Sequence, residues 1–384
     1  MSTPNLSQRV SLILPSASIS LFKEVNRLRD LGEDIIGMHM GEPDFSTPPE
    51  VIQATKDSLD NNDTKYSSVP GIPRFRNDLA NDFSKTGTKA NAKNIFIANG
   101  SKHILYLIFQ TILNPGDEVI IPIPYWVSFP EAVKLAGGIP VLVESCSDYS
   151  LDIDKIKEAT SNRTKIILIN TPNNPTGVIY NQKNLQLLYE HALKNDILIV
   201  ADQAYKSFVY EGEKFIQMSS FEKEPRHILT VQSFSKSFYM TGFRVGYVIA
   251  HEKIIHGLSK IQGHLSGNTA PFIQFAAMEA LKMEASIIQE QVKIFQKRRD
   301  IAIKLCNQKF QCKPPSGGFY LFPSILNMKE RFSTSEELAF FLLTEAKVAV
   351  LPGSAYGLEG HLRLSYTISI PRIKEAFSRI NKVL

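Results

Sequence analysis

Residues 233–247 read SFSKSFYMTGFRVGY, and no other stretch of the chain indicates as much about its fold and chemistry. Strand-like apolar runs at 227–232 and 245–250 flank it, so we expect Lys236 on a loop between two buried strands. Such loops are where α/β folds carry their chemistry. Most lysines are solvated surface charges, and this setting separates Lys236 from that ordinary case.

The lysine and a nearby arginine suit one kind of cofactor. Lys236 can hold an aldehyde as an imine and Arg244 can clamp a phosphate, which predicts pyridoxal 5′-phosphate (PLP). PLP chemistry needs a protonated pyridine nitrogen, and therefore a carboxylate at the end of a buried strand. Asp202 ends the apolar run 197–201, and Tyr205 is close enough along the chain to reach the ring hydroxyl. An aspartate in this position can also be a plain turn or cap residue.

Two further polar segments follow expected strands. The strand at 164–170 runs into the turn TPNNPTG (171–177), whose prolines can hold Asn174 with its amide pointing into a site. The strand at 118–121 leads to Trp126, the only tryptophan, whose flat ring can stack on a pyridine. Taken alone, the turn is a common one and the tryptophan also fits core packing.

A phosphate site is expected where residues 94–98, read as a strand, meet an apolar helix that runs through Leu113. Backbone N–H groups and the helix dipole favour an anion at such a helix start, near Ser101 and Lys102. The spacing is not that of a Walker loop. Ser101 can equally be an ordinary N-cap.

Six short motifs occur in one order: GSK (100–102), YW (125–126), NNPTG (173–177), DxxY (202–205), SxSK (233–236) and GxR (242–244). In this order they resemble the class I aminotransferases of PLP fold type I, most closely the bacterial aspartate aminotransferase branch. The resemblance runs from about Pro15 to the C-terminus. Its landmarks at the two ends are MGEPDF (40–45) and GHLRLSY (360–366).

The expected fold class is α/β. Strands alternating with helices over 94–250 predict a mostly parallel sheet covered on both faces. The resemblance implies a large PLP-binding domain, residues 46–289, with a seven-stranded sheet, and a small α/β domain built from residues 1–45 and 290–384. A long amphipathic helix expected at 279–305 would bridge the two.

The resemblance also implies roles at the cofactor ring. Lys236 resembles the Schiff-base lysine that later moves the substrate's proton, and Asp202 resembles the partner of the pyridine nitrogen. Asn174 and Tyr205 match the partners of the ring oxygen, and Trp126 matches the stacking ring. Of these, Lys236, Asp202 and Tyr205 are the predicted catalytic residues.

Other matched positions surround the cofactor's phosphate: Ser101, Lys102, Ser233, Arg244 and, from a neighbouring subunit, Tyr66. A tyrosine contributed by the neighbour implies a homodimer with active sites shared across the interface. The segment 266–268 is a second candidate to face the neighbour's phosphate.

Substrate binding is implied for Gly41, Trp126, Asn174 and Arg363. Arg363 matches the arginine that takes the α-carboxylate as a bidentate fork, a geometry that lysine does not reproduce. The Gly41 amide is expected on the same carboxylate.

The sequence says less about the group at the far end of the substrate than about its α-carboxylate. In the resembling branch a lysine at the position of Lys102, helped by a hydroxyl near Ser18, is associated with a distal carboxylate. This favours ping-pong transamination between aspartate and 2-oxoglutarate. Lys102 can also serve the phosphate alone or point to solvent, which leaves aromatic or prephenate-type substrates as the alternative.

Two other classes remain open. A PLP-dependent carbon-sulfur β-lyase would share fold and cofactor. A PLP-sensing regulator would carry a DNA-binding module, and no helix-turn-helix precedes Pro15. DQAY (202–205) and GFR (242–244) stand where the family often has DExY and GWR, and neither change alters a residue with a direct cofactor role.

Bulk properties exclude several functions. The chain has 384 residues, 43% of them hydrophobic, which is enough for two domains with sizeable cores. Its net charge of +5 has no clustered basic footprint beyond KRR (297–299), so nucleic-acid binding is not indicated. The three cysteines, Cys146, Cys306 and Cys312, are too few for a disulfide framework and lack metal spacing, which suits a reducing cytoplasm. No apolar stretch of the sequence approaches the length of a membrane span, and we do not expect residues 1–15 to be a secretory signal.

Overall fold

The larger part of the molecule is built on a seven-stranded sheet in the order β2-β8-β7-β6-β5-β3-β4. The computed structural model describes residues 5–384, so the first four residues of the predicted N-terminal segment lie outside the described part. The strands are β2 (Ile95–Ala98), β3 (Glu118–Ile123), β4 (Ile139–Glu144), β5 (Thr164–Asn170), β6 (Leu198–Asp202), β7 (Ile228–Ser233) and β8 (Gly246–Ile249). All neighbours pair in parallel except β8, which is antiparallel to β2 and β7. The predicted α/β fold with a mostly parallel seven-stranded sheet is confirmed.

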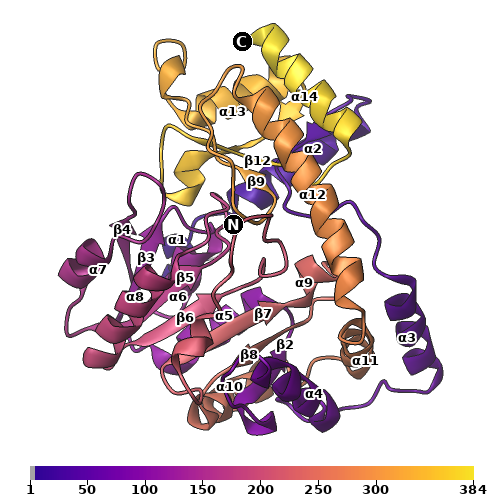
Figure 1. The fold of residues 1–384 in the computed structure, drawn as a ribbon, viewed down its shortest axis with the longest axis vertical. Coiled ribbons are helices and arrows are strands. Elements are labelled where there is room, and N and C mark those ends of the chain that lie inside the picture. The colour runs from indigo at the N-terminus through magenta and orange to yellow at the C-terminus, as the bar shows by residue number, and fades with distance from the viewer. Residues whose placement is uncertain (1–4) are drawn as a thin grey trace.

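Helices cover both faces of this sheet (Figure 1). Alternate strand side chains, such as Val119 and Leu168, pack on one face beneath α5 (Ser101–Ile112), α6 (Ser128–Leu135) and α10 (Glu252–Leu265). Their neighbours, such as Ile120 and Ile167, pack on the other face. The helices on that side are α4 (Pro73–Ser84), α7 (Ile153–Ala159), α8 (Gln182–Lys194) and α11 (Pro271–Ala280), with α3 (Pro49–Asp60) against α11. Because both faces are buried, the strands read as continuous apolar runs.

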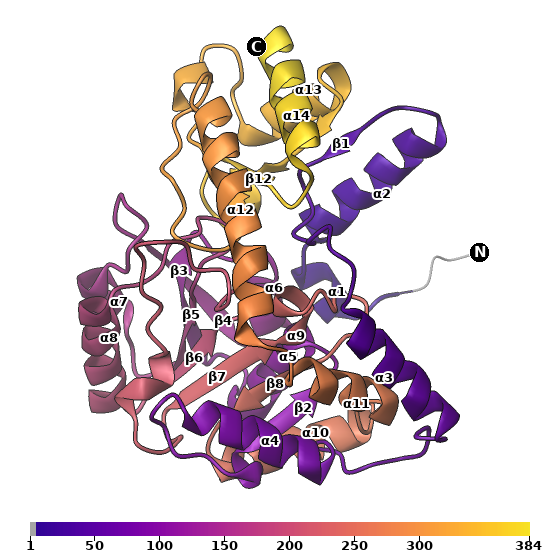
Figure 2. The ribbon, with the colours of Figure 1, turned by 45° about the vertical axis from the view of Figure 1, so that its right-hand side comes forward.

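A second, smaller unit is made from both ends of the chain (Figure 2). In it β1 (Ile36–Gly37) pairs in parallel with β10 (Val348–Ala349), and a three-stranded sheet has the order β11-β12-β9. Its remaining elements are α2 (Ala17–Asp30), β9 (Tyr320–Leu321), α13 (Ser335–Glu345), β11 (Leu351–Pro352), β12 (Leu362–Ser365) and α14 (Ile370–Val383). The boundary predicted between residues 289 and 290 falls inside α12 (Ala285–Cys306), which continues through it without a break. The domain boundaries stay predictions.

The helix expected at 279–305 is interrupted, so that expectation is wrong at its N-terminal end. Helix α11 ends at Ala280 and α12 begins at Ala285. Leu281 and Met283 turn inward and pack on the core shared by α4 and α11, while Glu284 is extended. The chain must leave the large sheet at this point, and burying these two side chains ends the first helix.

Two short helices and four 3-10 turns complete the path outside these elements. Helix α1 (Gln8–Leu12) precedes α2, and α9 (Phe234–Ser237) follows β7. The 3-10 turns are η1 (Ala92–Asn94), η2 (Met218–Phe221), η3 (Leu326–Met328) and η4 (Gly353–Tyr356). Across residues 5–384 we find no helix with the length and apolar character needed to cross a membrane.

The sheet edge under the small unit gathers polar strand ends. Parallel strands bring their carboxyl ends to one edge, and Asn170 of β5 is in register with Asp202 of β6. Ser233, the last residue of β7, is in register with Gly246, where the antiparallel β8 begins. This edge therefore brings together residues from four different strands, namely Asn170, Asp202, Ser233 and Gly246.

Arg298 of α12 joins three parts of the chain. It is 7% exposed, and its two terminal nitrogens donate to the Asp44 carboxylate at 2.6 and 2.9 Å. One of them also donates to the Thr367 carbonyl oxygen at 2.9 Å. This planar fork connects the N-terminal segment, the bridging helix and the stretch before α14.

Replacing Arg298 by lysine should weaken the molecule. Arg298→Lys keeps the charge but loses the bidentate geometry, and we expect the free energy of unfolding to fall by about 1–2 kcal/mol. The measurement is the urea midpoint at fixed protein concentration. Arg372→Lys is the control, because its pair with Asp34 is solvent-exposed and should barely move the midpoint. Equal midpoints for Arg298→Lys and the unaltered protein would contradict this.

Candidate active site

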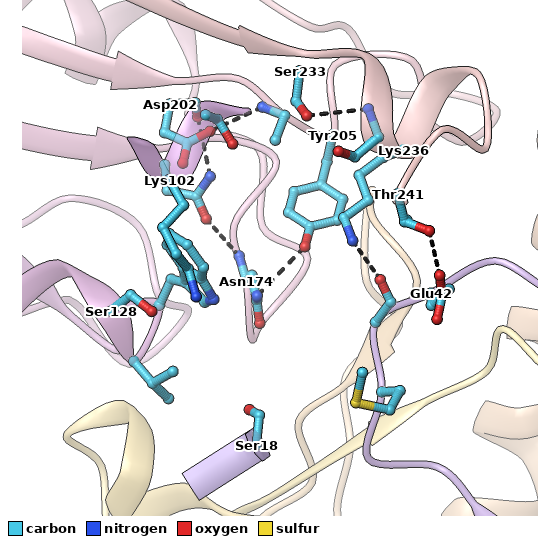
Figure 3. Close-up of a pocket in the computed structure, with 18 of the residues that line it drawn as sticks. Ser18, Glu42, Lys102, Ser128, Asn174, Asp202, Tyr205, Ser233, Lys236 and Thr241 are labelled. Atoms are coloured by element: carbon cyan, nitrogen blue, oxygen red, sulfur yellow. Dashed lines mark hydrogen bonds between the residues drawn. The ribbon is translucent and has the colours of Figure 1, made fainter. Parts of the chain in front are cut away.

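A pocket opens at this polar edge of the sheet, between the large and small units (Figure 3). It is lined by all the predicted cofactor and substrate residues except Tyr66, namely Gly41, Ser101, Lys102, Trp126, Asn174, Asp202, Tyr205, Ser233, Lys236, Arg244 and Arg363. Segments as distant in the sequence as 41 and 363 meet here. The structure therefore brings the predicted site together in one place.

Asp202 is a buried carboxyl group at the end of an apolar strand. Its side chain accepts a hydrogen bond from the Ala204 amide at 3.0 Å, and burial raises its pKa to about 6. Asn170 donates to the Asp202 carbonyl oxygen at 3.0 Å and accepts from the Asn174 amide at 2.8 Å. A carboxylate in such a setting is stabilised by a cation beside it, which fits a protonated pyridine nitrogen.

Lys236 lies in the short helix α9, directly after β7. The Ser233 hydroxyl accepts from the Ser235 amide at 3.1 Å and so starts this helix. The Lys236 Nζ donates to the Gly41 carbonyl oxygen at 2.6 Å. Burial lowers the Lys236 pKa to about 8, and the nearby carboxylate of Glu42 opposes that change. The amine is therefore partly neutral close to physiological pH, as a nucleophile requires.

The start of α5 forms a cradle with Arg244. Gly100, with φ of +85°, holds the N-cap position, so Ser101 is the first helical residue and not the cap. A Cβ at Gly100 would lie 2.7 Å from an Arg244 terminal nitrogen, and one at Gly246 would lie 2.9 Å from the Ser101 nitrogen. Backbone amides at a helix start beside a guanidinium fit a phosphate group.

Arg363 and the ring-oxygen candidates form one buried network. Asn174 Nδ2 donates to the Tyr205 hydroxyl at 3.5 Å, and Arg363 donates to Asn174 Oδ1 at 3.2 Å. The Tyr205 and Tyr320 hydroxyls lie 2.9 Å apart. Arg363 is 3% exposed, stacks 4.4 Å from the Tyr320 ring centroid, and makes no ion pair among residues 5–384. A buried arginine of this kind is suited to a carboxylate ligand.

Lys102 is a further cation in the lining of the pocket. The Lys102 Nζ is 5.0 Å from the Trp126 ring centroid, and burial together with Arg244 lowers the Lys102 pKa. Ser18 and Ser128 lie along the same wall (Figure 3). The pocket thus holds Lys102 and Arg363 in addition to Lys236 and the Arg244 of the phosphate cradle.

Two of the positions implied by the resemblance were expected to face a neighbouring subunit, and both lie outside the pocket of their own chain. Tyr66 is 98% exposed and does not line this pocket. The segment 266–268 follows α10 and also lies outside the lining residues. Sequence reasoning missed Asn170 as a site residue. The rule that found Asp202, a polar residue ending an apolar strand, would also have found Asn170.

The fold and the site define a class, the PLP-dependent enzymes of fold type I. The family model described as aminotransferase class I and II matches residues 33–380. The chain belongs to this family, and like its other members it depends on PLP.

Individual relatives resemble the chain over its full length. It is 37% identical to an aspartate aminotransferase from Bacillus sp. (strain YM-2), covering 98% of each chain. It is 36% identical to an aspartate/prephenate aminotransferase from Thermus thermophilus, covering 99% of this chain and 98% of the other. The solved structure of Thermus thermophilus aspartate aminotransferase with maleate has a TM-score of 0.95 at 34% identity, with both chains fully covered.

The negative charge of Glu42 raises the pKa of Lys236 against the effect of burial. Glu42→Gln removes the anion that favours the ammonium form, while Thr241, which donates to this carboxylate, keeps an acceptor. We expect the Lys236 pKa to fall below about 8. Thr241→Val is the matched control, since it removes the hydrogen bond and leaves the charge.

The measurement is the pH dependence of Lys236 acetylation in PLP-free protein, followed by mass spectrometry. The midpoint should shift to lower pH in Glu42→Gln and stay in place in Thr241→Val. A shift in the valine variant alone would mean that the hydrogen bond, not the charge, controls the amine.

Proposed function

We propose that the protein transfers the amino group of L-aspartate to 2-oxoglutarate by a ping-pong mechanism. The observation that carries this proposal is the pair of cations, Arg363 and Lys102, in one pocket with Lys236. A dicarboxylic amino acid offers one carboxylate to each cation. Relatives named aspartate aminotransferase, and a neighbouring structure solved with the dicarboxylate maleate, support the same assignment.

The proposed roles start with binding and orientation. Arg363 holds the α-carboxylate as a fork, and the Gly41 amide contacts the same group. Asn174 accepts a hydrogen bond from Arg363 and donates one to Tyr205. It therefore links the residue proposed to bind the substrate carboxylate to a residue proposed to bind the cofactor ring. When bound, PLP supplies a covalent attachment for the amino group and an electron sink for the Cα electrons.

Proton transfer is assigned to two residues. Asp202 would keep a proton on the pyridine nitrogen, because that cation would stabilise its buried carboxylate. Lys236 would take the proton from the substrate Cα and return it to the cofactor carbon on the other side of the amino nitrogen, two atoms along. Trp126 would cover the cofactor ring, and Ser101, Ser233 and Arg244 would hold its phosphate.

An aromatic or prephenate-type substrate is the second candidate. It is favoured by relatives with aspartate/prephenate in their names and by the likeness to an aromatic aminotransferase from Pyrococcus horikoshii, with a TM-score of 0.88 at 33% identity. The apolar side chains of Ile19 and Val127 in the pocket wall suit such a substrate. The amino-acid panel below separates the two candidates.

We also propose a cytoplasmic homodimer with shared active sites. An exposed Tyr66 cannot serve its own pocket, and the N-terminal segment presents exposed apolar side chains including Leu6, Leu12 and Leu14. Sedimentation with the mass of a single chain would contradict the dimer.

Absorbance spectra of the purified protein test the reaction. Aspartate should convert a visible PLP band into the near-ultraviolet pyridoxamine form, and 2-oxoglutarate should reverse the change. Lys236→Ala should keep the fold by circular dichroism but lose turnover, because no amine remains to move the proton. Conversion by phenylalanine and not by aspartate would favour the second candidate, and full activity of Lys236→Ala would refute the mechanism.

Lys102→Gln tests the distal carboxylate. We expect kcat/KM for aspartate to fall roughly 10- to 100-fold, as for the loss of a hydrogen bond to a charged group. Alanine, which has no distal carboxylate, should be affected much less. An equal loss for both amino acids would place Lys102 on the phosphate instead.

A further inference from the structure

The loop after β4 carries a tyrosine from the large unit to the small one. Tyr149 has a φ of +64°, in the left-handed region that bulky side chains rarely adopt. Its amide donates to the Cys146 carbonyl oxygen at 2.8 Å, and the Cys146 amide donates to the Ser150 carbonyl oxygen at 3.0 Å, which closes the turn. The Tyr149 ring meets those of His361 and Phe322 edge-on, with centroids 6.2 and 6.0 Å away. A strained backbone that delivers a side chain to a unit boundary indicates a role for that side chain.

Tyr149 and His361 form a hydrogen bond between the two units. The Tyr149 hydroxyl oxygen lies 3.0 Å from His361 Nε2, and His361 Nδ1 lies 3.1 Å from the Glu359 carbonyl oxygen. A carbonyl oxygen only accepts, so Nδ1 carries the hydrogen and Nε2 of the neutral ring is an acceptor. Burial lowers the pKa of His361 and raises the pKa of Tyr149 to about 12, which keeps both side chains neutral near pH 7. The Tyr149 hydroxyl therefore donates to His361 Nε2.

Packed rings and a short stretch of backbone connect His361 to Arg363. His361 stacks on Phe322 with ring centroids 4.9 Å apart and planes at 10°, and Phe322 meets Tyr356 edge-on at 6.2 Å. The Tyr356 ring centroid is in turn 5.1 Å from the Arg363 guanidinium carbon. His361 also lies two residues before Arg363, and its carbonyl oxygen accepts from the Gly353 amide at 2.8 Å. The position of His361 therefore constrains the strand β12 that carries Arg363.

The site proposed for the substrate α-carboxylate needs both units in this arrangement. Arg363 comes from the small unit and donates to Asn174 Oδ1 of the large unit at 3.2 Å. We propose that Tyr149 is a positioning residue for the α-carboxylate, whose hydrogen bond to His361 holds β12, and Arg363 with it, in the arrangement that binds this group. The inference rests on the proposed function, because it takes Arg363 as the residue that binds the α-carboxylate.

Tyr149→Phe tests this role, because it keeps the ring and removes the hydroxyl. Losing the hydrogen bond lowers the fraction of molecules in the binding arrangement, so every substrate with an α-carboxylate should bind more weakly by the same factor. We expect the Kd of maleate for the PLP-loaded enzyme, measured by calorimetry, to rise roughly 3- to 10-fold. The KM values for aspartate and alanine should rise equally while kcat at saturation stays unchanged. Lys102→Gln, in contrast, is expected to affect aspartate far more than alanine.

Matched variants separate the hydrogen bond from general effects on stability. Thr160→Val removes another hydroxyl–imidazole contact, 2.9 Å from Thr160 Oγ1 to His191 Nε2, that lies wholly within the large unit, and it should leave both Kd and KM unchanged. His361→Phe keeps a ring on Phe322 but has no acceptor, whereas His361→Gln keeps an acceptor and should retain more of the affinity. Adding Tyr149→Phe to His361→Phe should cause no further loss, because the bond is already absent.

An unchanged maleate Kd in Tyr149→Phe overturns the proposal, and so does a fall in kcat with KM unaltered. An equal loss of affinity in Thr160→Val, or additive losses in the double variant, would show that Tyr149 does not act through His361. Each of these outcomes is a comparison with an unaltered enzyme that converts aspartate. Failure of that unaltered enzyme to convert aspartate would instead count against the proposed function.

Discussion

A charged group at the end of a buried strand is the constraint on which the active site depends. Asp202 closes an apolar strand that is covered on both sides, and burial raises its pKa to about 6. Lys236, one strand further along the sheet, is buried as well and has its pKa lowered to about 8. Burial disfavours the charged form of both side chains. A cofactor with a pyridinium nitrogen would stabilise the Asp202 carboxylate, and its aldehyde would react with the neutral Lys236 amine.

The substrate end of the pocket depends on contacts between the two ends of the chain. The Ser365 amide donates to the Met38 carbonyl oxygen at 2.7 Å, and Arg363 donates to the His39 carbonyl oxygen. A Cβ at Gly41 would lie 1.7 Å from the Tyr320 hydroxyl oxygen, so only glycine permits this approach. Arg363 is consequently oriented by residues more than three hundred positions away, and both chain ends belong to one catalytic unit.

Much of the site could be predicted because each of its signals is local. An apolar strand followed by a polar residue predicts the position of Asp202, and a lysine on a loop between two such strands predicts that of Lys236. Parallel strands bring their carboxyl ends to one edge, so these local signals also implied that the residues would converge. The same rule identifies Asn170, and the helix expected to open near Ser101 does begin there, with Gly100 as its N-cap.

The sequence by itself determined the fold class, the cofactor and the residues at the strand ends, because periodicity and turn chemistry act over a few neighbouring residues. Only the tertiary structure decided the partnership of Tyr320 with Tyr205, the closeness of Glu42 to Lys236, and the break between α11 and α12. These features depend on how the small unit packs over the sheet and where the chain must turn to reach it. No local pattern encodes a distance between segments that meet only after both units have folded.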